Sequence, residues 1–373
     1  MKIAILTFFE SENYGTVLQA YATQKYLETI GHDVELLHIK RMVNGRSSHY
    51  VAVSKKTTLL ERVRYKAVSM IKKKSIQEKG EKFKAFRKKY LQISKYYDSE
   101  EQLINELEDY DLFVSGGDQI WNPYHKVFSL HYMFDFLPAE QPRIAYGSSF
   151  GVATIKDETI LSKMKDWLIR YRAIGIREKS GVAIIQKMGL DALQVLDPVF
   201  LLKDNWSTFI TERPKKKKYC LVYALIGYPQ VENDKIVAFA KMRGMEVVIL
   251  PFNRQNSLNG FNKQFGLSPQ EFLNYIAYAE YIFTNSFHGL AFSILFQKQF
   301  TLLGCDSEEG FAKRERLIDL LGQFGIEDRD FENIEKVIDY TAVDNELQIR
   351  LNNSKKYIQE SINKIGVNGH VVV

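Results

Sequence analysis

Residues 1–39 read MKIAILTFFESENYGTVLQAYATQKYLETIGHDVELLHI, and this stretch decides the fold class. The apolar runs KIAILTF at 2–8 and DVELLHI at 33–39 each have the length and composition of a buried strand. Residues 14–31 between them have the pattern of a helix that ends at Gly31. A strand, a helix and a second strand in this order predict a β-α-β unit with parallel strands.

The same alternation continues along the chain. Strand-like runs separated by helix-like segments fall at 111–115, 143–150, 173–176, 193–197, 219–225, 246–252, 281–285 and 299–304. Such alternation is typical of open parallel sheets with helices on both faces. We therefore expect an α/β protein made of two Rossmann-like doubly wound domains that face a cleft.

Changes in composition suggest the domain boundaries. We predict a first α/β domain at 1–202, with a basic helical insertion at about 40–95, and a second α/β domain at 219–330. The segment 203–218 contains a proline and four consecutive lysines, and we interpret it as the linker. Residues 331–373 are predicted to be a helical segment that packs back on the N-terminal domain.

Positive charge is concentrated in the insertion. Between Lys40 and Lys95 there are 18 Lys or Arg side chains against three Glu, whereas the whole chain has a net charge of +6. Apolar residues recur there at roughly helical intervals, which predicts one or two amphipathic helices. A solvated helix surface is the plain interpretation, and the functional alternative is contact with an anionic membrane or a lipid carrier that bears phosphate. No nucleic-acid-binding motif accompanies the charge, so we do not expect nucleic acid as a partner.

Several features predict the compartment. The first apolar run is soon followed by Glu10 and Glu12 and lacks a cleavage site, so we interpret it as a strand and not as a signal peptide. No segment approaches the roughly 18 apolar residues of a membrane span. We interpret Cys220 and Cys305 as buried thiols in a reducing cytoplasm. A cytoplasmic protein is expected, with peripheral binding at the inner face of the membrane as a further hypothesis.

Polar loops follow several strands, at the edge where open α/β sheets bind ligands. In ESENYGTVLQA, Asn13 can cap the helix and Gly15 lets a ligand or another part of the chain come close. In SGGDQIWNP, the side chains of Asp118, Gln119 and Trp121 suit sugar recognition, although a Gly-Gly-Asp turn is common without it.

Two further loops carry candidate catalytic groups. Arg177, in GIREKS, follows a strand and begins a helix, where a guanidinium suits a carboxylate or phosphate; a structural salt bridge, for example to Asp197, is the alternative. His288, in TNSFHGLAF, lies at a helix start, where an imidazole can transfer a proton, although a lone histidine is more often structural. Zinc, P-loop and dinucleotide motifs are missing from the sequence, so we expect no metal and no cofactor.

The ordered motifs NYGTVLQAYA, SGGDQIWNP, IAYGSSFG, IGIREKS, LDPVFLL and TNSFHGLAFSILF, followed by RERLIDLLGQFGIEDR, resemble the polysaccharide pyruvyl transferase family. The resemblance covers residues 1 to about 330. It implies a fold similar to the GT-B glycosyltransferases and transfer of a pyruvyl group from phosphoenolpyruvate to two hydroxyls of a sugar, as a ketal. The context it implies is the synthesis of bacterial exopolysaccharide, capsule or cell-wall glycan, with a sugar or lipid-linked oligosaccharide as acceptor.

The resemblance also implies roles for individual residues. His288 would be the acid/base, and the donor would be held by Arg177, by Arg316 and by the helix start that comprises Ser286, Phe287 and Gly289. The acceptor sugar would meet the remaining candidates, which are Asn13, Asp118, Gln119 and Trp121.

One position departs from the pattern. In the best understood branch of the family the motif reads Arg-Leu-His, whereas this chain has Ser286, Phe287 and His288, so a guanidinium is missing at 286. Either Arg316 replaces it, or this branch uses another donor or performs a related transfer. Two other functions stay open: a GT-B-type glycosyltransferase that uses a nucleotide sugar, and a non-catalytic glycan-binding or scaffold protein of polysaccharide assembly.

Overall fold

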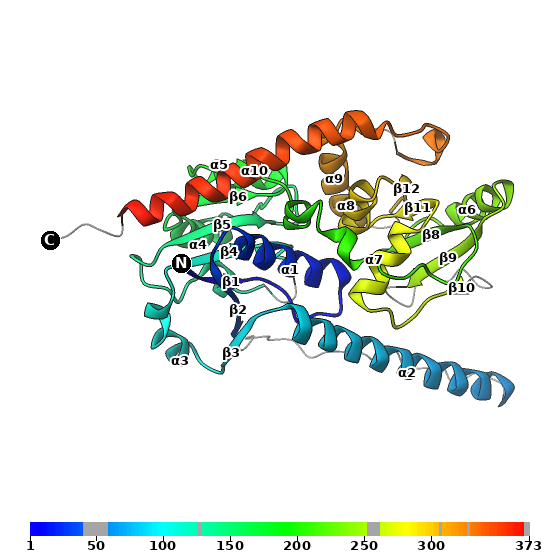
Figure 1. The fold of residues 1–373 in the computed structure, drawn as a ribbon, viewed down its shortest axis with the longest axis horizontal. Coiled ribbons are helices and arrows are strands. Elements are labelled where there is room, and N and C mark those ends of the chain that lie inside the picture. The colour runs from blue at the N-terminus through cyan, green and yellow to red at the C-terminus, as the bar shows by residue number, and fades with distance from the viewer. Residues whose placement is uncertain (40–58, 126–127, 252–261, 306–307, 327–328, 369–373) are drawn as a thin grey trace.

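The computed structural model describes residues 1–39, 59–125, 128–251, 262–305, 308–326 and 329–368. In this part of the chain the strands form two parallel sheets (Figure 1). The first has the order β3-β2-β1-β4-β5-β6-β7 and the second the order β10-β9-β8-β11-β12. The strands are β1 (Lys2–Leu6), β2 (Asp33–Ile39), β3 (Ile93–Tyr97), β4 (Leu112–Gly116), β5 (Arg143–Ser148), β6 (Ala173–Ile176), β7 (Leu193–Gln194), β8 (Tyr219–Ala224), β9 (Glu246–Pro251), β10 (Asn262–Lys263), β11 (Tyr281–Thr284) and β12 (Gln299–Leu302).

Helices cover both sheets, as the alternation of strands and helices in the sequence predicted. The α-helices are α1 (Tyr14–Thr29), α2 (Leu59–Tyr90), α3 (Glu100–Ile104), α4 (Glu158–Leu168), α5 (Lys179–Lys187), α6 (Val231–Met242), α7 (Pro269–Ala277), α8 (Phe287–Leu295), α9 (Glu308–Gln323) and α10 (Tyr340–Asn368). Short 3₁₀ helices are η1 (Leu107–Asp109), η2 (Leu130–Met133), η3 (Pro198–Leu202), η4 (Trp206–Phe209) and η5 (Phe331–Asn333). None of the helices in the described ranges is both long and apolar enough to cross a membrane.

Helix α1 lies between the two sheets and is buried on almost every side. It begins where the Asn13 side chain accepts hydrogen bonds from the backbone of Gly15 and Thr16, and the chain turns after it at Gly31, whose φ is +95°. Its Tyr14 stacks on Phe272 of α7, with ring centres 4.4 Å apart. The helix that connects the first two strands is therefore also part of the contact between the domains.

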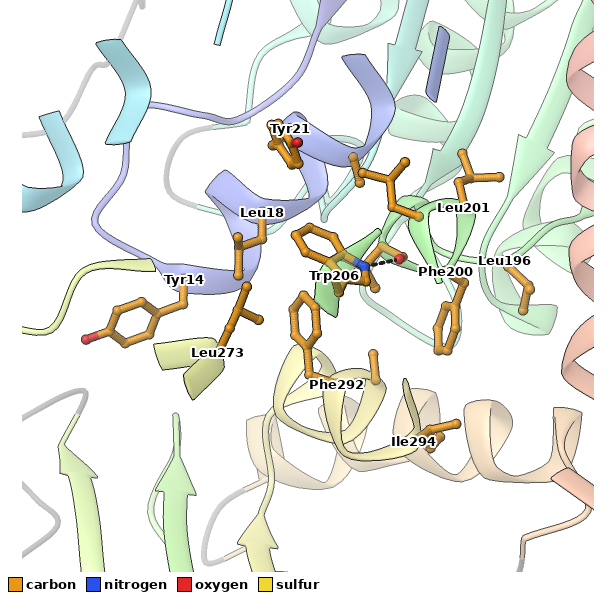
Figure 2. Close-up of a cluster of buried hydrophobic side chains, with 14 of the residues drawn as sticks. Tyr14, Leu18, Tyr21, Leu196, Phe200, Leu201, Trp206, Leu273, Phe292 and Ile294 are labelled. Atoms are coloured by element: carbon orange, nitrogen blue, oxygen red, sulfur yellow. Dashed lines mark hydrogen bonds between the residues drawn. The ribbon is translucent and has the colours of Figure 1, made fainter. Parts of the chain in front are cut away.

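A continuous apolar cluster joins the two domains (Figure 2). It packs side chains of α1, η3, η4, α7 and α8 around Trp206 and Phe292, whose ring centres are 5.1 Å apart. The Trp206 indole N–H donates to the carbonyl of Val199 at 2.7 Å. Trp206 belongs to the segment 203–218 that we interpreted as a linker, so the first part of that segment is packed as core.

Helix α10 runs back from the second sheet towards the first (Figure 1). The hydroxyl of Tyr357 donates to the carbonyl of Ala145 in β5, at 2.8 Å. The hydroxyl of Ser354 accepts a hydrogen bond from the backbone of Leu196. These contacts fasten the C-terminal helix to the first sheet, although it begins at Tyr340, later than the predicted start of helix at 331.

The basic segment contains a strand that the sequence pattern did not reveal. Only 59–90 of the predicted insertion is helical in the described residues, as the single helix α2, and β3 follows it at the edge of the first sheet. Residues 40–58 lie outside the described part of the chain. Helix α2 carries Phe83 and Phe86 in buried positions, and its Lys82 pairs with Glu271 of α7 at 2.8 Å. Part of the basic helix therefore bridges the two domains.

Candidate active site

Charged side chains from both domains meet where the carboxyl ends of the two sheets face each other. Asp118 follows β4, Arg177 follows β6 and Asp197 follows β7 in the first domain. His288 lies in the first turn of α8, directly after β11, and Arg316 lies on α9. Loops at strand ends can bring such distant residues together because the carboxyl ends of parallel strands share one edge.

Arg177 is enclosed by carboxylates. Its Nη1 lies 2.8 Å from Asp197, its Nε 3.5 Å from Glu178 and its Nη2 4.0 Å from Asp118, with the side chain only 1% exposed. Burial would lower the pKa of Arg177, but the carboxylates of Asp197, Glu178 and Asp118 outweigh it and raise the pKa. The salt bridge to Asp197, which the sequence left as an alternative, is present. A donor-binding role for Arg177 stays a prediction.

Arg177 also contacts the second domain. Its guanidinium carbon lies 4.2 Å from the centre of the Phe287 ring, which is a cation–π geometry. Phe287 is the first residue of α8, next to His288. The predicted anion anchor of one domain is thus stacked on the helix start that carries the predicted acid/base of the other.

Asp197 lies between Arg177 and the imidazole. Its Oδ1 accepts from the backbone of Val199, and its Oδ2 lies 3.7 Å from Nε2 of His288, in addition to its contact with Arg177. Burial alone would raise the pKa of Asp197, but the charges of His288 and Arg177 lower the pKa to about 2. The buried carboxylate therefore stays ionised at neutral pH.

His288 approaches α1 so closely that only glycine fits opposite it. A methyl group added at Gly15 would lie 2.0 Å from Nδ1 and 2.2 Å from Cγ of His288. The sequence indicated that Gly15 permits a close approach, and the group that approaches is the imidazole of the other domain. The position of His288 thus depends on the absence of a side chain at residue 15.

We expect Gly15→Ala to displace His288 and lower activity, and to destabilise the protein by about 1–3 kcal/mol through overpacking. Helix propensity alone would favour alanine by about 1 kcal/mol. Gly322→Ala is the matched control, because Gly322 lies in α9 with no atom within 4 Å of the added methyl among the described residues. Denaturant unfolding of both variants tests this, and a stabilised, fully active Gly15→Ala would contradict it.

Among the residues that the structure describes, Arg316 has no carboxylate partner comparable to those of Arg177. With the Gln119 amide oxygen turned towards it, Nη1 and Nη2 donate at 2.9 and 3.2 Å, while Nε has no hydrogen-bond partner among the described residues. Burial and the nearby charge of Arg177 lower the pKa of Arg316 to about 10, against the opposite effects of Glu178 and Asp118. This buried guanidinium is under-compensated, which is the condition expected of a group that awaits an anion.

Asp118 and Gln119 are held in a strained turn at this site. Asp118 has φ +52°, accepts from the Thr16 hydroxyl at 2.5 Å and accepts from the backbone of Gln119. Its side chain is 16% exposed. Burial would raise the pKa of Asp118, but Arg177 and then His288 lower it. Both residues lie beside the charged cluster, and their contact with an acceptor stays a prediction.

Trp121 lies elsewhere. Its side chain is fully buried in the core of the first domain, and its indole N–H donates to the carbonyl of Tyr132 at 3.0 Å and to the hydroxyl of Ser115 at 3.2 Å. No face of the ring is left for a sugar, so the predicted acceptor contact of Trp121 does not fit this structure. Asn13 uses its side-chain oxygen to cap α1.

Ser286 and Gly289 form the cap of α8. The Ser286 hydroxyl accepts from the backbone of Gly289 at 3.1 Å, and a methyl group at Gly289 would lie 2.4 Å from the hydroxyl of Thr284 and 2.9 Å from the ring of Tyr223. Both residues therefore shape the helix start that carries His288. Their contact with the donor stays a prediction.

Two groups of this cluster were not singled out from the sequence. Glu178 accepts from the backbone of Phe150 at 2.8 Å while its other oxygen faces Arg177, and Thr16 holds Asp118. Glu178 directly follows Arg177 in GIREKS, and Thr16 follows the capped turn at Gly15. The sequence signal that could have identified Glu178 and Thr16 is that each directly follows a residue that the sequence analysis had singled out, Arg177 and Gly15 respectively.

Two parallel α/β sheets whose carboxyl ends meet at one charged site define a protein of the GT-B-like class. Solved structures with a similar fold support this class. A putative UDP-N-acetylglucosamine 2-epimerase from Listeria monocytogenes aligns with a TM-score of 0.52 at 10% identity, over 98% of this chain and 97% of that one. The UDP-N-acetylglucosamine 2-epimerase from Rickettsia bellii gives 0.50 at 11% identity, over 100% and 98%. At such identities the likeness concerns the fold alone, and it confirms the predicted fold class.

The model of the polysaccharide pyruvyl transferase family matches residues 13–307. The chain therefore belongs to the polysaccharide pyruvyl transferase family, as the resemblance of its motifs predicted. No curated protein sequence is detectably similar to the chain. The matched range contains Asp118, Arg177, Asp197 and His288, whereas Arg316 lies beyond it.

Proposed function

We propose that the protein transfers a pyruvyl group from phosphoenolpyruvate to two hydroxyls of a sugar in a bacterial polysaccharide or its lipid-linked precursor, forming a ketal. The family membership supports a transferase of polysaccharide biosynthesis. The observation that carries the donor assignment is the buried, under-compensated guanidinium of Arg316, in the same charged cluster as His288.

The two arginines have different roles in this proposal. Arg177 already faces three carboxylates, so a further anion there would meet their repulsion. Arg316 faces a neutral amide, and a carboxylate or phosphate would supply the opposite charge that its buried guanidinium lacks among the described residues. Arg316 then supplies the guanidinium that is missing at position 286, where Ser286 instead caps α8.

The reaction requires one proton to reach carbon and one phosphate to leave. A proton adds to the methylene carbon of the donor, and a sugar hydroxyl attacks C2 and loses its proton. A second hydroxyl then bonds to C2 as the C2–O bond to phosphate breaks, and its proton leaves to the base or with the departing phosphate. His288 is the group that donates or accepts these protons. Arg316 binds the donor and stabilises the departing phosphate. Asp118 and Gln119, whose side chains are partly exposed beside the cluster, orient the acceptor.

The test is a thermal-shift titration with phosphoenolpyruvate, UDP, GDP and inorganic phosphate. A ligand at one hundred times its Kd should stabilise the native protein by about 2.7 kcal/mol. We expect phosphoenolpyruvate to stabilise the wild type and to have no effect on Arg316→Met. The same substitution should not destabilise the unliganded protein, because it removes a buried, poorly compensated charge.

Arg314→Ala is the matched control for this titration. Arg314 lies on the same helix, but it donates to the carbonyl of Leu303 and its charge acts on Glu232. It should keep the response to phosphoenolpyruvate. An equal loss in both variants would contradict a specific site at Arg316.

Other outcomes would favour the alternatives. Stabilisation by UDP or GDP alone would indicate a glycosyltransferase, a function compatible with the GT-B-like fold that this chain shares with enzymes named for UDP-N-acetylglucosamine. No stabilisation by any of the four compounds, together with binding of an oligosaccharide, would indicate a glycan-binding protein.

A peripheral position at an anionic membrane is a further part of the proposal. Helix α2 and the residues before it carry the basic segment, although Lys79 lies over the ring of Tyr14 and Lys82 pairs with Glu271. The exposed Lys74, Lys84 and Lys88 remain on its surface. Binding of the intact protein to vesicles that contain anionic lipid tests this, and no binding would leave α2 as a solvated and interdomain helix.

A further inference from the structure

We propose that Asp197 is a positioning residue that holds the Nε2–H of His288 from the opposite domain, and that Nδ1 is therefore the nitrogen that exchanges protons with the substrate. The second half of this inference rests on the proposed function, because it takes His288 as the acid/base. The first half concerns the geometry of the free protein and can be tested without any substrate.

Asp197 is a rigid, buried carboxylate. Its side chain has no solvent exposure, Oδ1 accepts from the backbone of Val199 at 3.1 Å, and Oδ2 accepts from Arg177 at 2.8 Å. Its backbone is fixed by the start of η3, where Pro198 is the first residue. A carboxylate held by three such constraints can impose an orientation on a neighbour.

The imidazole presents Nε2 to this carboxylate. Nε2 is buried and has no hydrogen-bond partner among the described residues, and its separation from Oδ2 of Asp197 is 3.7 Å. A hydrogen bond would require a shift of roughly 0.5–1 Å. Leaving a buried ring nitrogen unpaired is costly, so the proton that can satisfy both groups belongs on Nε2.

A role for Asp197 as counterion of Arg177 alone accounts for less of this geometry. Arg177 has two further carboxylates, Glu178 and Asp118, within 4.0 Å. In the described residues Asp197 is the one carboxylate within 4.0 Å of His288. Asp118 also acts on His288 through its charge, but its own hydrogen bonds come from Thr16 and Gln119.

Gly15 allows the ring of His288 to pack closely on α1. A Cβ at residue 15 would lie 2.0 Å from Nδ1, so only glycine admits the imidazole in this orientation. Of the two ring nitrogens, Nε2 alone is both buried and without a hydrogen-bond partner among the described residues. A histidine whose Nε2–H is held by a carboxylate presents Nδ1 as the basic atom in its neutral form. The two contacts, Asp197 at one nitrogen and Gly15 at the other, come from the first domain and orient a ring carried by the second.

The direct test is nitrogen NMR of the protein labelled with ¹⁵N-histidine, recorded well above the ordinary histidine pKa of about 6.5. Protonated and unprotonated ring nitrogens give distinct signals, and His288→Gln assigns the resonances of His288 among the seven histidines. We expect Nε2 to carry the proton in the wild type, and a mixture of tautomers in Asp197→Asn. An unprotonated Nε2 in the wild type would overturn the proposal, even if Asp197→Asn failed to fold.

A kinetic cycle tests whether Asp197 acts through His288. We expect Asp197→Asn to lower kcat by up to about 10⁴, the size of the effect when a hydrolase triad loses its orienting carboxylate, with a smaller effect on the KM for the donor. In the His288→Gln background the same substitution should have no further effect. Equal losses in both backgrounds would mean that Asp197 serves stability only. If phosphoenolpyruvate does not stabilise the protein but NMR shows the proton on Nε2, the proposed donor is wrong and the Asp197–His288 pairing still holds.

Discussion

Replacing His288 by alanine is expected to lower kcat by about 10²–10⁴ and to leave the fold intact. A positioned proton donor or acceptor typically contributes a rate factor of this size. The side chain lies in the first turn of α8, and its contacts are with Gly15, Phe287 and Asp197, none of which depends on it for an ordinary hydrogen bond. Formation of ketal or release of phosphate from phosphoenolpyruvate would measure the effect.

His131→Ala is the matched control for this experiment. His131 pairs with Asp135 at 2.6 Å in the first domain, outside the charged cluster. Its removal should leave turnover unchanged while it deletes the same type of side chain. Near-normal turnover of His288→Ala, with an unchanged unfolding midpoint in denaturant, would show that the imidazole is not the acid/base.

Replacing Arg177 by alanine should destabilise the protein by about 3–5 kcal/mol, because the substitution leaves the buried carboxylates of Asp197 and Glu178, and the partly exposed one of Asp118, without their common cation. The effect should depend on pH. Because the pKa of Asp197 is depressed to about 2, its contribution is present above the ordinary aspartate value of about 4 and is lost as the pH falls towards 2. Denaturant unfolding at pH 7 and at about pH 3 would measure both the loss and its decline.

An exposed ion pair provides the control for Arg177→Ala. Arg243 contacts Glu335 with 40% and 63% of the two side chains exposed, so Arg243→Ala should cost no more than about 1 kcal/mol. A loss of similar size for Arg177→Ala, together with weaker binding of phosphoenolpyruvate, would restore Arg177 as the donor anchor. A large loss of stability in Arg177→Ala, together with loss of phosphoenolpyruvate binding only in Arg316→Met, would support a structural role for Arg177 and a donor-binding role for Arg316.

Much of the fold could be predicted because its signals are local. The apolar runs 2–8 and 33–39 with the helix between them correspond to β1, α1 and β2, and Gly31 does end the helix in a left-handed conformation. Strand β3 was missed because its short run lies at the end of the basic segment and its partner strand is distant in sequence. Pairing at a sheet edge depends on the neighbouring strand more than on the local sequence.

The candidate site was predictable in membership but less so in roles. Position after a strand pointed to Asp118, Arg177 and His288, and all three lie in one cluster. The same rule pointed to Trp121, whose ring instead turns inward to the carbonyl of Tyr132. The chain direction at a strand end restricts where a residue lies, but the rotamer of its side chain depends on which buried partner it can satisfy.

The sequence by itself determined the alternation of strands and helices, the family, and the residues placed at strand ends, because periodicity, helix capping and turn chemistry act over a few residues. Only the tertiary structure decided that Arg177 is neutralised while Arg316 is not, that Gly15 faces an imidazole, and that Asp197 of one domain meets His288 of the other. Electrostatic and packing energies depend on distances and on exclusion of water. Those quantities exist only after the two sheets have come together.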